Sequence, residues 1–271
     1  GSLGIYTATH FPKEKQMGIA RITVSWIGLY PEPTFRTRRL TEFHRDDLIP
    51  LFARITSDDG PSYNPIWYQV ADGYIHSGHV QLVQWHLQTP HRLLPEEGAL
   101  FEISVPYTRS RSSPDPESRP FYRLYYQSTA WVNAVQFDHE GRAWYRIHDD
   151  TLRVSYYARA EHLKWIPPEQ LSPISAEVPL HAKPIEKALR IPELRAYEYD
   201  RLVMRTRISS GIPNLEPQEN DIPTATPTGH FYIDKKMPFK HMGDGHLTSD
   251  LEAYELLGVP WVAFFHETGV A

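Results

Sequence analysis

The 271 residues contain no cysteine. This absence excludes disulfide bonds, thiolate metal sites and a thiol nucleophile from the chain, although it does not decide the compartment in which the protein works. No run of about 18 apolar residues occurs, so we expect no transmembrane segment. With a formal net charge of −5 the chain has no excess of Lys and Arg, which argues against nucleic acid as a partner.

Proline and aromatic residues are abundant instead, with 24 Pro, 16 Tyr and 7 Trp. Proline fixes φ and lacks an N–H donor, so it collects in turns and at strand edges, whereas aromatic side chains favour strands. No segment shows a long helical stripe of apolar residues. We therefore predict a mainly β protein with many turns.

The 14 histidines are candidate metal ligands, but their spacing argues against a metal site. The closest pairs are His76 with His79 and His241 with His246. Residues three apart in a strand point to opposite faces, and neither pair has a third ligand at zinc-site spacing. The chain also has no Gly-x-Ser-x-Gly turn and no Gly-rich phosphate loop. We expect no metal and no cofactor.

An internal repeat organises the first part of the chain. Three pairs of segments share one offset of 77 residues: Tyr30 and Tyr107, the Trp-Tyr strands at 67–70 and 144–147, and the acidic turns at 72–73 and 149–150. A constant offset across a dipeptide that contains Trp predicts a duplication.

Each copy is expected to form a small β-barrel. Apolar and polar residues alternate over 20–26, which predicts a half-buried strand. The turn at 71–73 predicts a hairpin, and 80–83 would close the sheet. This order of an exposed loop, a Trp-Tyr strand, a hairpin and a short closing strand resembles bacterial SH3-like domains, which serve as spacers or as cell-wall and peptide-binding modules. Trp67 and Trp144 are predicted to be core aromatics.

Five prolines without periodicity lie in residues 167–184, which we expect to be an extended linker. Three strand-like segments follow it, at 185–191, 194–199 and 202–208. The predicted organisation is an N-terminal segment (1–17), SH3-like repeat 1 (18–95), SH3-like repeat 2 (96–166), the proline-rich linker (167–184) and a third unit (185–271).

The third unit carries a series of short motifs in a fixed order. They are Ala-Tyr-Glu-Tyr-Asp-Arg-Leu-Val at 196–203, Ile-Ser-Ser-Gly at 208–211, Thr-Pro-Thr-Gly at 226–229, Lys-Met-Pro-Phe-Lys-His-Met-Gly at 236–243, and the strand-like segment 254–265. The ordered set resembles the catalytic domain of L,D-transpeptidases. In that family a Ser-His-Gly-Cys motif comes shortly after the last segment, so we expect this chain to be a fragment with an incomplete β-sandwich of the L,D-transpeptidase type.

The resemblance implies a two-step acyl transfer that cross-links peptidoglycan. A cysteine thiolate attacks a carbonyl of a stem peptide, the terminal D-alanine leaves, and an amine of a second stem resolves the acyl-enzyme. Because this chain has no cysteine, we assign no catalytic residue to it and expect it to be inactive in transpeptidation. His266 is expected to be a bystander.

Three residues in the matched segments are candidates for lining the substrate cleft: His241, Met242 and Tyr254. The segment 236–243 looks like the mobile segment over the cleft in related sequences, and ordinary packing or solvent exposure is the alternative for all three residues. Trp261 lies in an apolar run and is expected in the core. Gly229 is expected to supply backbone freedom to a turn.

The resemblance also implies partners and a location. Peptidoglycan stem peptides are the expected ligands, and an extracellular or cell-envelope place in a bacterium is the expected location, although the chain shows no signal peptide. Two alternatives stay open: a non-catalytic cell-wall-binding protein that acts through its SH3-like repeats, and a structural β protein whose similarity is one of fold alone.

Overall fold

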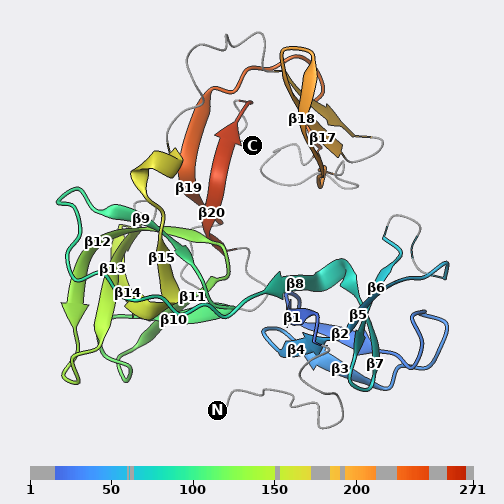
Figure 1. Ribbon diagram of the computed structural model, residues 1–271, viewed down its shortest axis with the longest axis horizontal. Coiled ribbons are helices and arrows are strands. Elements are labelled where there is room, and N and C mark those ends of the chain that lie inside the picture. Colours follow the sequence, from blue (N-terminus) through green and yellow to red (C-terminus); the bar gives the residue numbers. More distant parts are fainter. Residues whose placement is uncertain are drawn as a thin grey trace, which may run out of the picture. The chain divides into compact units, whose positions relative to one another are not determined.

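The computed structural model describes residues 16–59, 61, 64–149, 153–171, 184–189, 193–211, 225–243 and 255–266. Strands make up 54% of the structure and helical turns 5%, so the predicted mainly β fold is confirmed. The contacts divide the chain into two compact units, Gly1–Trp165 with His241–Val259, and Ile166–Lys240 with Pro260–Ala271. Figure 1 shows β1 to β8 gathered in one group and β9 to β15 in another.

The first group, called repeat 1 below, forms three small antiparallel sheets in the described residues. β1 (Gly18–Ile22) lies between β4 (Leu48–Leu51) and β8 (Val80–Val83), β2 (Trp26–Leu29) pairs with β3 (Thr41–His44), and β6 (Ile66–Val70) lies between β5 (Ala53–Thr56) and β7 (Gly73–His76). The predicted hairpin at 71–73 and the predicted closing strand at 80–83 are confirmed.

The single strand predicted over 20–26 is wrong. The chain turns between β1 and β2, where Ser25 accepts a hydrogen bond from the backbone N–H of Arg45, and Trp26 begins the next strand with 51% of its surface exposed. The alternation of apolar residues continues through this turn in the sequence, so the pattern alone does not reveal it. The core of repeat 1 consists of Ala20, Ile22, Ile27, Leu29, Phe43, Ile49, Leu51, Tyr68, Val70 and Ile75.

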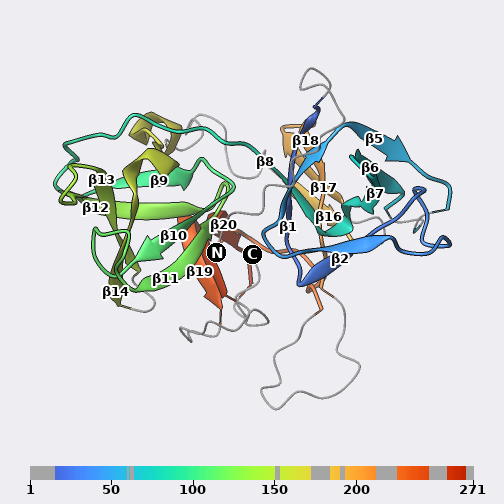
Figure 2. The same ribbon diagram turned by 90° about the horizontal axis from the view of Figure 1, so that it is seen from below.

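The second group, repeat 2, forms one sheet in the order β11-β10-β14-β13-β12-β9-β15, which does not close into a barrel. Its strands are β9 (Ala99–Ile103), β10 (Tyr107–Arg111), β11 (Pro120–Tyr125), β12 (Thr129–Phe137), β13 (Ala143–Asp149), β14 (Val154–Arg159) and β15 (Leu163–Trp165). β12 is nine residues long and takes the place of both β4 and β5, so it joins pairings that repeat 1 divides between separate sheets. Its neighbours β9 and β13 are also seen in Figure 2.

The strand registers show which residues of the two repeats are equivalent. In both repeats the first strand pairs with the fourth position of the fold and the Trp strand pairs with the strand that follows it. The equivalent positions have three different offsets: 81 residues for Ala20 and Phe101, 77 for Trp67 and Trp144, and 83 for His76 and Arg159.

The single offset of 77 residues is therefore wrong outside the Trp strand. The loop before that strand has nine residues in repeat 1 (57–65) and five in repeat 2 (138–142), and the hairpin after it is six residues longer in repeat 2. Tyr30 bridges to Tyr74 as Arg111 pairs with Tyr157, so Tyr30 corresponds to Arg111. Loop lengths that differ shift the numbering without disturbing the strands.

Two small sheets follow the repeats. β16 (Ile185–Ala188), β17 (Glu193–Glu198) and β18 (Arg201–Arg207) form one antiparallel sheet, and β19 (Lys235–Gly243) pairs with β20 (Glu255–Phe264). The three strands predicted after the linker are confirmed, and every residue of β18 is exposed. A short helical turn, Pro168–Leu171, lies at the start of the proline-rich segment.

Candidate functional site

The three residues expected to line a cleft have different environments. His241 and Met242 lie in β19, where His241 is buried and Met242 half-buried, whereas Tyr254 lies outside the described residues. Nδ1 of His241 is 2.8 Å from Oδ2 of Asp149, at the end of β13. The structure thus brings His241 against repeat 2, and cleft lining by the three residues stays a prediction.

The Asp149–His241 pair has a buried phenol beside it. Tyr156 on β14 is buried, and its pKa is raised well above the usual range by burial first, then by the charge of Asp149 and by Tyr122. An acidic partner fixes the orientation of an imidazole ring, because one ring nitrogen is held by the carboxylate. Both side chains are about 95% buried, so the pair fastens β19 to repeat 2.

A second contact attaches β20 to the same repeat. Gly258 has a φ of 70°, and a Cβ added there would lie 2.0 Å from the backbone oxygen of Thr129 at the start of β12. Only glycine permits this backbone-to-backbone approach. The two contacts place one strand of the hairpin on β13 and the other on β12.

The other residues selected from the third unit have mixed outcomes. Trp261 is 53% exposed with a φ of 56°, so its expected place in the core is wrong, whereas its neighbour Val262 is 5% exposed. Successive side chains of a strand point to opposite faces, and the apolar run in the sequence conceals which face is buried. Gly229 has a φ of 145°, in keeping with its predicted backbone freedom, and the ring of His266 packs edge-on against Phe231.

An aromatic cluster surrounds the buried tryptophan of repeat 1. Trp67 on β6 is fully buried and contacts Phe35, Tyr30 and His76, with ring centroids 4.7, 5.8 and 5.2 Å from its own. Phe35 comes from the loop between β2 and β3 and is 48% exposed. We call these four residues the aromatic cluster of repeat 1. It combines a buried indole with an exposed apolar cover.

His76 in this cluster has both ring nitrogens engaged with the backbone. Its Nε2 lies 2.9 Å from the carbonyl oxygen of Asn64, and its Nδ1 accepts the backbone N–H of Gly78 at 3.3 Å. These partners suit the neutral tautomer with a proton on Nε2. The indole N–H of Trp67, in contrast, is buried and has no acceptor within the described part of the chain.

The equivalent tryptophan of repeat 2 has charged neighbours instead. Trp144 is buried, and its Nε1–H donates to Oδ2 of Asp138 at 3.0 Å. Arg142 donates to the same oxygen at 2.7 Å, and the guanidinium of Arg159 lies 5.8 Å from the centre of the indole ring. We call Asp138, Arg142, Trp144 and Arg159 the charged cluster of repeat 2. As predicted, both tryptophans are core residues.

Asp138 is held ionised by its donors. Burial opposes the charge of its carboxylate, but hydrogen bonds from Trp144, from the side chain and backbone of Arg142 and from the backbone of Glu140 outweigh burial and keep its pKa well below the usual range. Only 1% of the Asp138 side chain is exposed. The acceptor of the Trp144 indole is therefore a permanent carboxylate of the same repeat.

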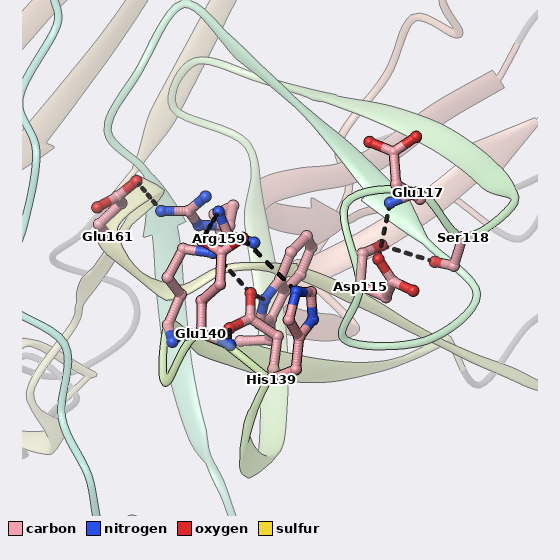
Figure 3. A network of polar contacts seen from close by, with 10 residues as sticks. Asp115, Glu117, Ser118, His139, Glu140, Arg159 and Glu161 are labelled. Carbon is pink, nitrogen blue, oxygen red and sulfur yellow. Dashed lines mark hydrogen bonds and ion pairs between the residues drawn. The ribbon is translucent and has the colours of Figure 1, made fainter.

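Further polar contacts surround the charged cluster, as Figure 3 shows. Arg159 pairs with Glu161 at 2.7 Å and Arg142 with Glu140 at 2.6 Å. The loop after β10 has its own hydrogen bonds, from the backbone N–H of Glu117 and from the hydroxyl of Ser118 to Asp115. The surface around Trp144 is thus occupied by side chains of the chain itself.

A buried ionic network joins the two repeats. Asp46, after β3, binds Nη1 of Arg21 at 2.8 Å through one carboxylate oxygen and Arg123 of β11 through the other. The guanidinium of Arg21 also lies 4.0 Å from the centre of the Tyr125 ring. Sequence reasoning missed this network, because nothing in the pattern around Asp46 distinguishes it from an exposed turn acid.

Metal chemistry and membrane insertion find little support in these parts of the structure. Among the described residues no group of three or more His, Asp or Glu side chains is placed to hold a metal ion. No helix within the described ranges is long and apolar enough to cross a membrane.

The geometry defines a mainly β protein with two related small domains, and the known proteins add little to it. No protein family matches the chain, and no curated protein matches it. Among solved structures, NlpC2 from Trichomonas vaginalis is 13% identical over 56% of this chain, with a TM-score of 0.20, and the chain spans about half of its length (49%). The cell-wall-binding domain (CBD) of the endolysin LysPBC5 is 9% identical over 57% of this chain and 98% of its own length, with a TM-score of 0.21. Neither likeness is close enough to decide a fold or a function.

Proposed function

We propose that the protein is a peptidoglycan-associated protein related to the L,D-transpeptidases and that this chain binds the bacterial cell wall through its repeats. The ordered motifs from 196–203 to 254–265 are the observation that carries the proposal. Stem peptides are the proposed ligand, and the cell envelope is the proposed location. The exposed aromatic surface of Phe35 above Trp67 supports a binding role for repeat 1.

Binding rather than catalysis is proposed for this chain because its side chains include no thiol. The family reaction forms and resolves a thioester on cysteine, and no other side chain of the matched segments replaces that nucleophile. His241 is buried against Asp149, which occupies one of its ring nitrogens. The chain therefore lacks the reacting group of the family and retains surfaces that bind.

Association with the wall is tested by co-sedimentation of the chain with insoluble peptidoglycan. We expect the protein to appear in the pellet and to be released by soluble stem peptides. Sacculi from which the stem peptides have been removed by an amidase serve as the control and should retain much less protein. Equal retention on both kinds of sacculi, or none on either, would count against the proposal.

The absence of transpeptidation is a separate expectation. A tetrapeptide-stem donor and an acceptor stem incubated with the chain should give no release of D-alanine above the protein-free rate. Because this expectation depends on the missing thiol alone, release of D-alanine at an enzymatic rate would show that another side chain acts as the nucleophile.

A further inference from the structure

The indole N–H of Trp67 is a buried donor without an acceptor in the described residues. Burial of a polar group without a hydrogen bond costs about 1–3 kcal/mol, so such groups are rare in folded proteins and call for an explanation. Trp67 is fully buried in a ring of aromatic side chains, none of which offers it an acceptor.

Repeat 2 shows which residues satisfy the same donor. Ser57 stands where repeat 2 has Asp138, because each residue follows the last ladder pair before the Trp strand. Each also donates its backbone N–H across the loop, Ser57 to Pro65 at 2.9 Å and Asp138 to Arg142 at 3.0 Å. Repeat 1 therefore has Ser and Pro where repeat 2 has the carboxylate and the guanidinium.

Ser57 does not replace Asp138 as an acceptor. Its hydroxyl oxygen accepts the backbone N–H of Asp59 at 3.2 Å and stays within its own loop. Repeat 1 thus keeps the donor of the charged cluster and loses both of its charged partners. The position beside the Trp67 indole is open to an acceptor from another molecule.

We propose that the aromatic cluster of repeat 1 is a peptide-binding site in which a neutral carbonyl oxygen of the ligand accepts the Trp67 indole N–H. This inference rests on the proposed function, which makes the ligand a stem peptide with small apolar residues. A carbonyl is favoured over a carboxylate because Pro65 replaces the arginine that neutralises the carboxylate in repeat 2. The rings of Phe35 and Tyr30 form the apolar walls for the methyl groups of the ligand.

Phe35 controls access to the indole. Its ring lies 4.7 Å from that of Trp67, and it is the cluster residue with the most exposed surface. An exposed side chain changes rotamer within picoseconds to nanoseconds, so rotation of Phe35 opens the donor without rearrangement of the strands. Repeat 2 has no equivalent opening, because Asp138 already occupies the indole N–H of Trp144.

Nuclear magnetic resonance of the full chain tests the site directly. The probe is diacetyl-L-Lys-D-Ala-D-Ala with an amidated carboxyl end, added at millimolar concentrations, and a Trp67→Phe variant assigns the indole signal of Trp67. We expect the Trp67 signal to shift and the Trp144 signal to stay in place. No shift at Trp67, or equal shifts at both indoles, overturns the proposal.

The free acid of the same peptide tests the class of acceptor. We expect it to bind no more tightly than the amide, because the site holds no cation for a carboxylate. If the acid binds ten times more tightly or better, the ligand group is a carboxylate and the proposal of a neutral carbonyl is wrong.

Variants at Ser57 provide the matched pair. Ser57→Asp introduces the acceptor of repeat 2, so we expect it to shift the Trp67 signal without peptide and to weaken peptide binding at least tenfold. Ser57→Ala leaves the position open and should bind as the unchanged protein does. Equal binding by Ser57→Asp and Ser57→Ala contradicts the proposal.

Failure of this inference is distinguishable from failure of the proposed function. Peptide binding at Trp67 without retention on sacculi would keep the site and reject the wall association. Retention on sacculi by both Ser57 variants alike would keep the wall association and reject the aromatic cluster as its site.

Discussion

The two tryptophans of the repeats, Trp67 and Trp144, occupy equivalent strand positions and are buried to the same degree, yet their surroundings differ in kind. Trp67 has three aromatic neighbours and no hydrogen-bond acceptor, whereas Trp144 has an ionised carboxylate and two arginines. The strand decides that the indole is buried. The length and sequence of the preceding loop decide what its N–H meets, so a duplicated fold supplies one open and one closed version of the same position.

The largest expected effect comes from the ionic network that only repeat 1 contributes. Asp46 and Gln127 are equivalent turn residues with φ of 70° and 64°, but Asp46 is buried between two arginines and Gln127 is exposed. Asp46→Asn leaves both guanidinium groups without their counter-charge, so we expect a loss of about 3 kcal/mol in the free energy of unfolding. Urea denaturation measures it.

The control for that variant is Gln127→Asn in the equivalent turn of repeat 2. We expect it to change the free energy of unfolding by less than about 0.5 kcal/mol, because the side chain is exposed. Similar losses for the two variants would mean that the turn conformation, and not the ion pairs of Asp46, determines the stability.

A smaller effect is expected when either indole is replaced. Trp67→Phe and Trp144→Phe both leave a cavity, which costs about 1–3 kcal/mol. Trp144→Phe also deprives Asp138 of a donor, whereas Trp67→Phe removes a donor that has no partner. We therefore expect Trp144→Phe to lower the melting temperature more.

Calorimetry of the two variants side by side decides the order. If Trp67→Phe is the more damaging one, the Trp67 N–H has an acceptor in solution, and the difference between the clusters is smaller than the structure indicates.

The smallest effect is a difference in acid sensitivity between the repeats. Burial lowers the pKa of His162 in repeat 2, although Glu161 opposes the shift, whereas the equivalent His79 is exposed. Because the unfolded chain binds a proton more readily than the folded one, the contribution of His162 to stability is present above its ordinary pKa of 6.5 and is lost as the pH falls below that value. Asp138, with its lowered pKa, adds a further loss below about 3.8.

Amide hydrogen exchange at pH 7.5, 6 and 5 measures this difference, with rates corrected for the intrinsic effect of pH. We expect protection of β13 and β14 to fall more than that of β6 and β7 as the pH is lowered. In a His162→Gln variant the two repeats should respond alike, and an unchanged difference there would exclude His162 as the cause.

Much of the strand content follows from the sequence, because alternation of apolar residues reports a half-buried strand wherever the strand is straight. The hairpin at 71–73, the closing strand at 80–83 and the three strands after the linker were all predictable in this way. The pattern failed at Trp26, where the chain turns without a break in the alternation, and at Trp261, where an apolar run has one exposed face.

The candidate site was less predictable than the fold. His241 was selected by resemblance, but its partner Asp149 lies 92 residues away, and no local pattern connects the two. The duplicated Trp-Tyr strand was visible, whereas the equivalence of Ser57 and Asp138 required the ladder registers, because a loop of different length separates each of them from its tryptophan. Loop lengths hide such pairs from any search at a constant offset.

The sequence by itself determined that the protein is mainly β, that one unit is duplicated, that Trp67 and Trp144 are buried and that the chain has no thiol chemistry. These properties depend on composition and on the two-residue period of a strand, which are local. The tertiary structure alone decided that Asp46 joins the repeats, that His241 is held by Asp149 and that only one indole has an acceptor. Such contacts join residues far apart in the chain, and hydrogen bonds and ion pairs act only over a few ångströms, so they exist only once the strands have been brought together.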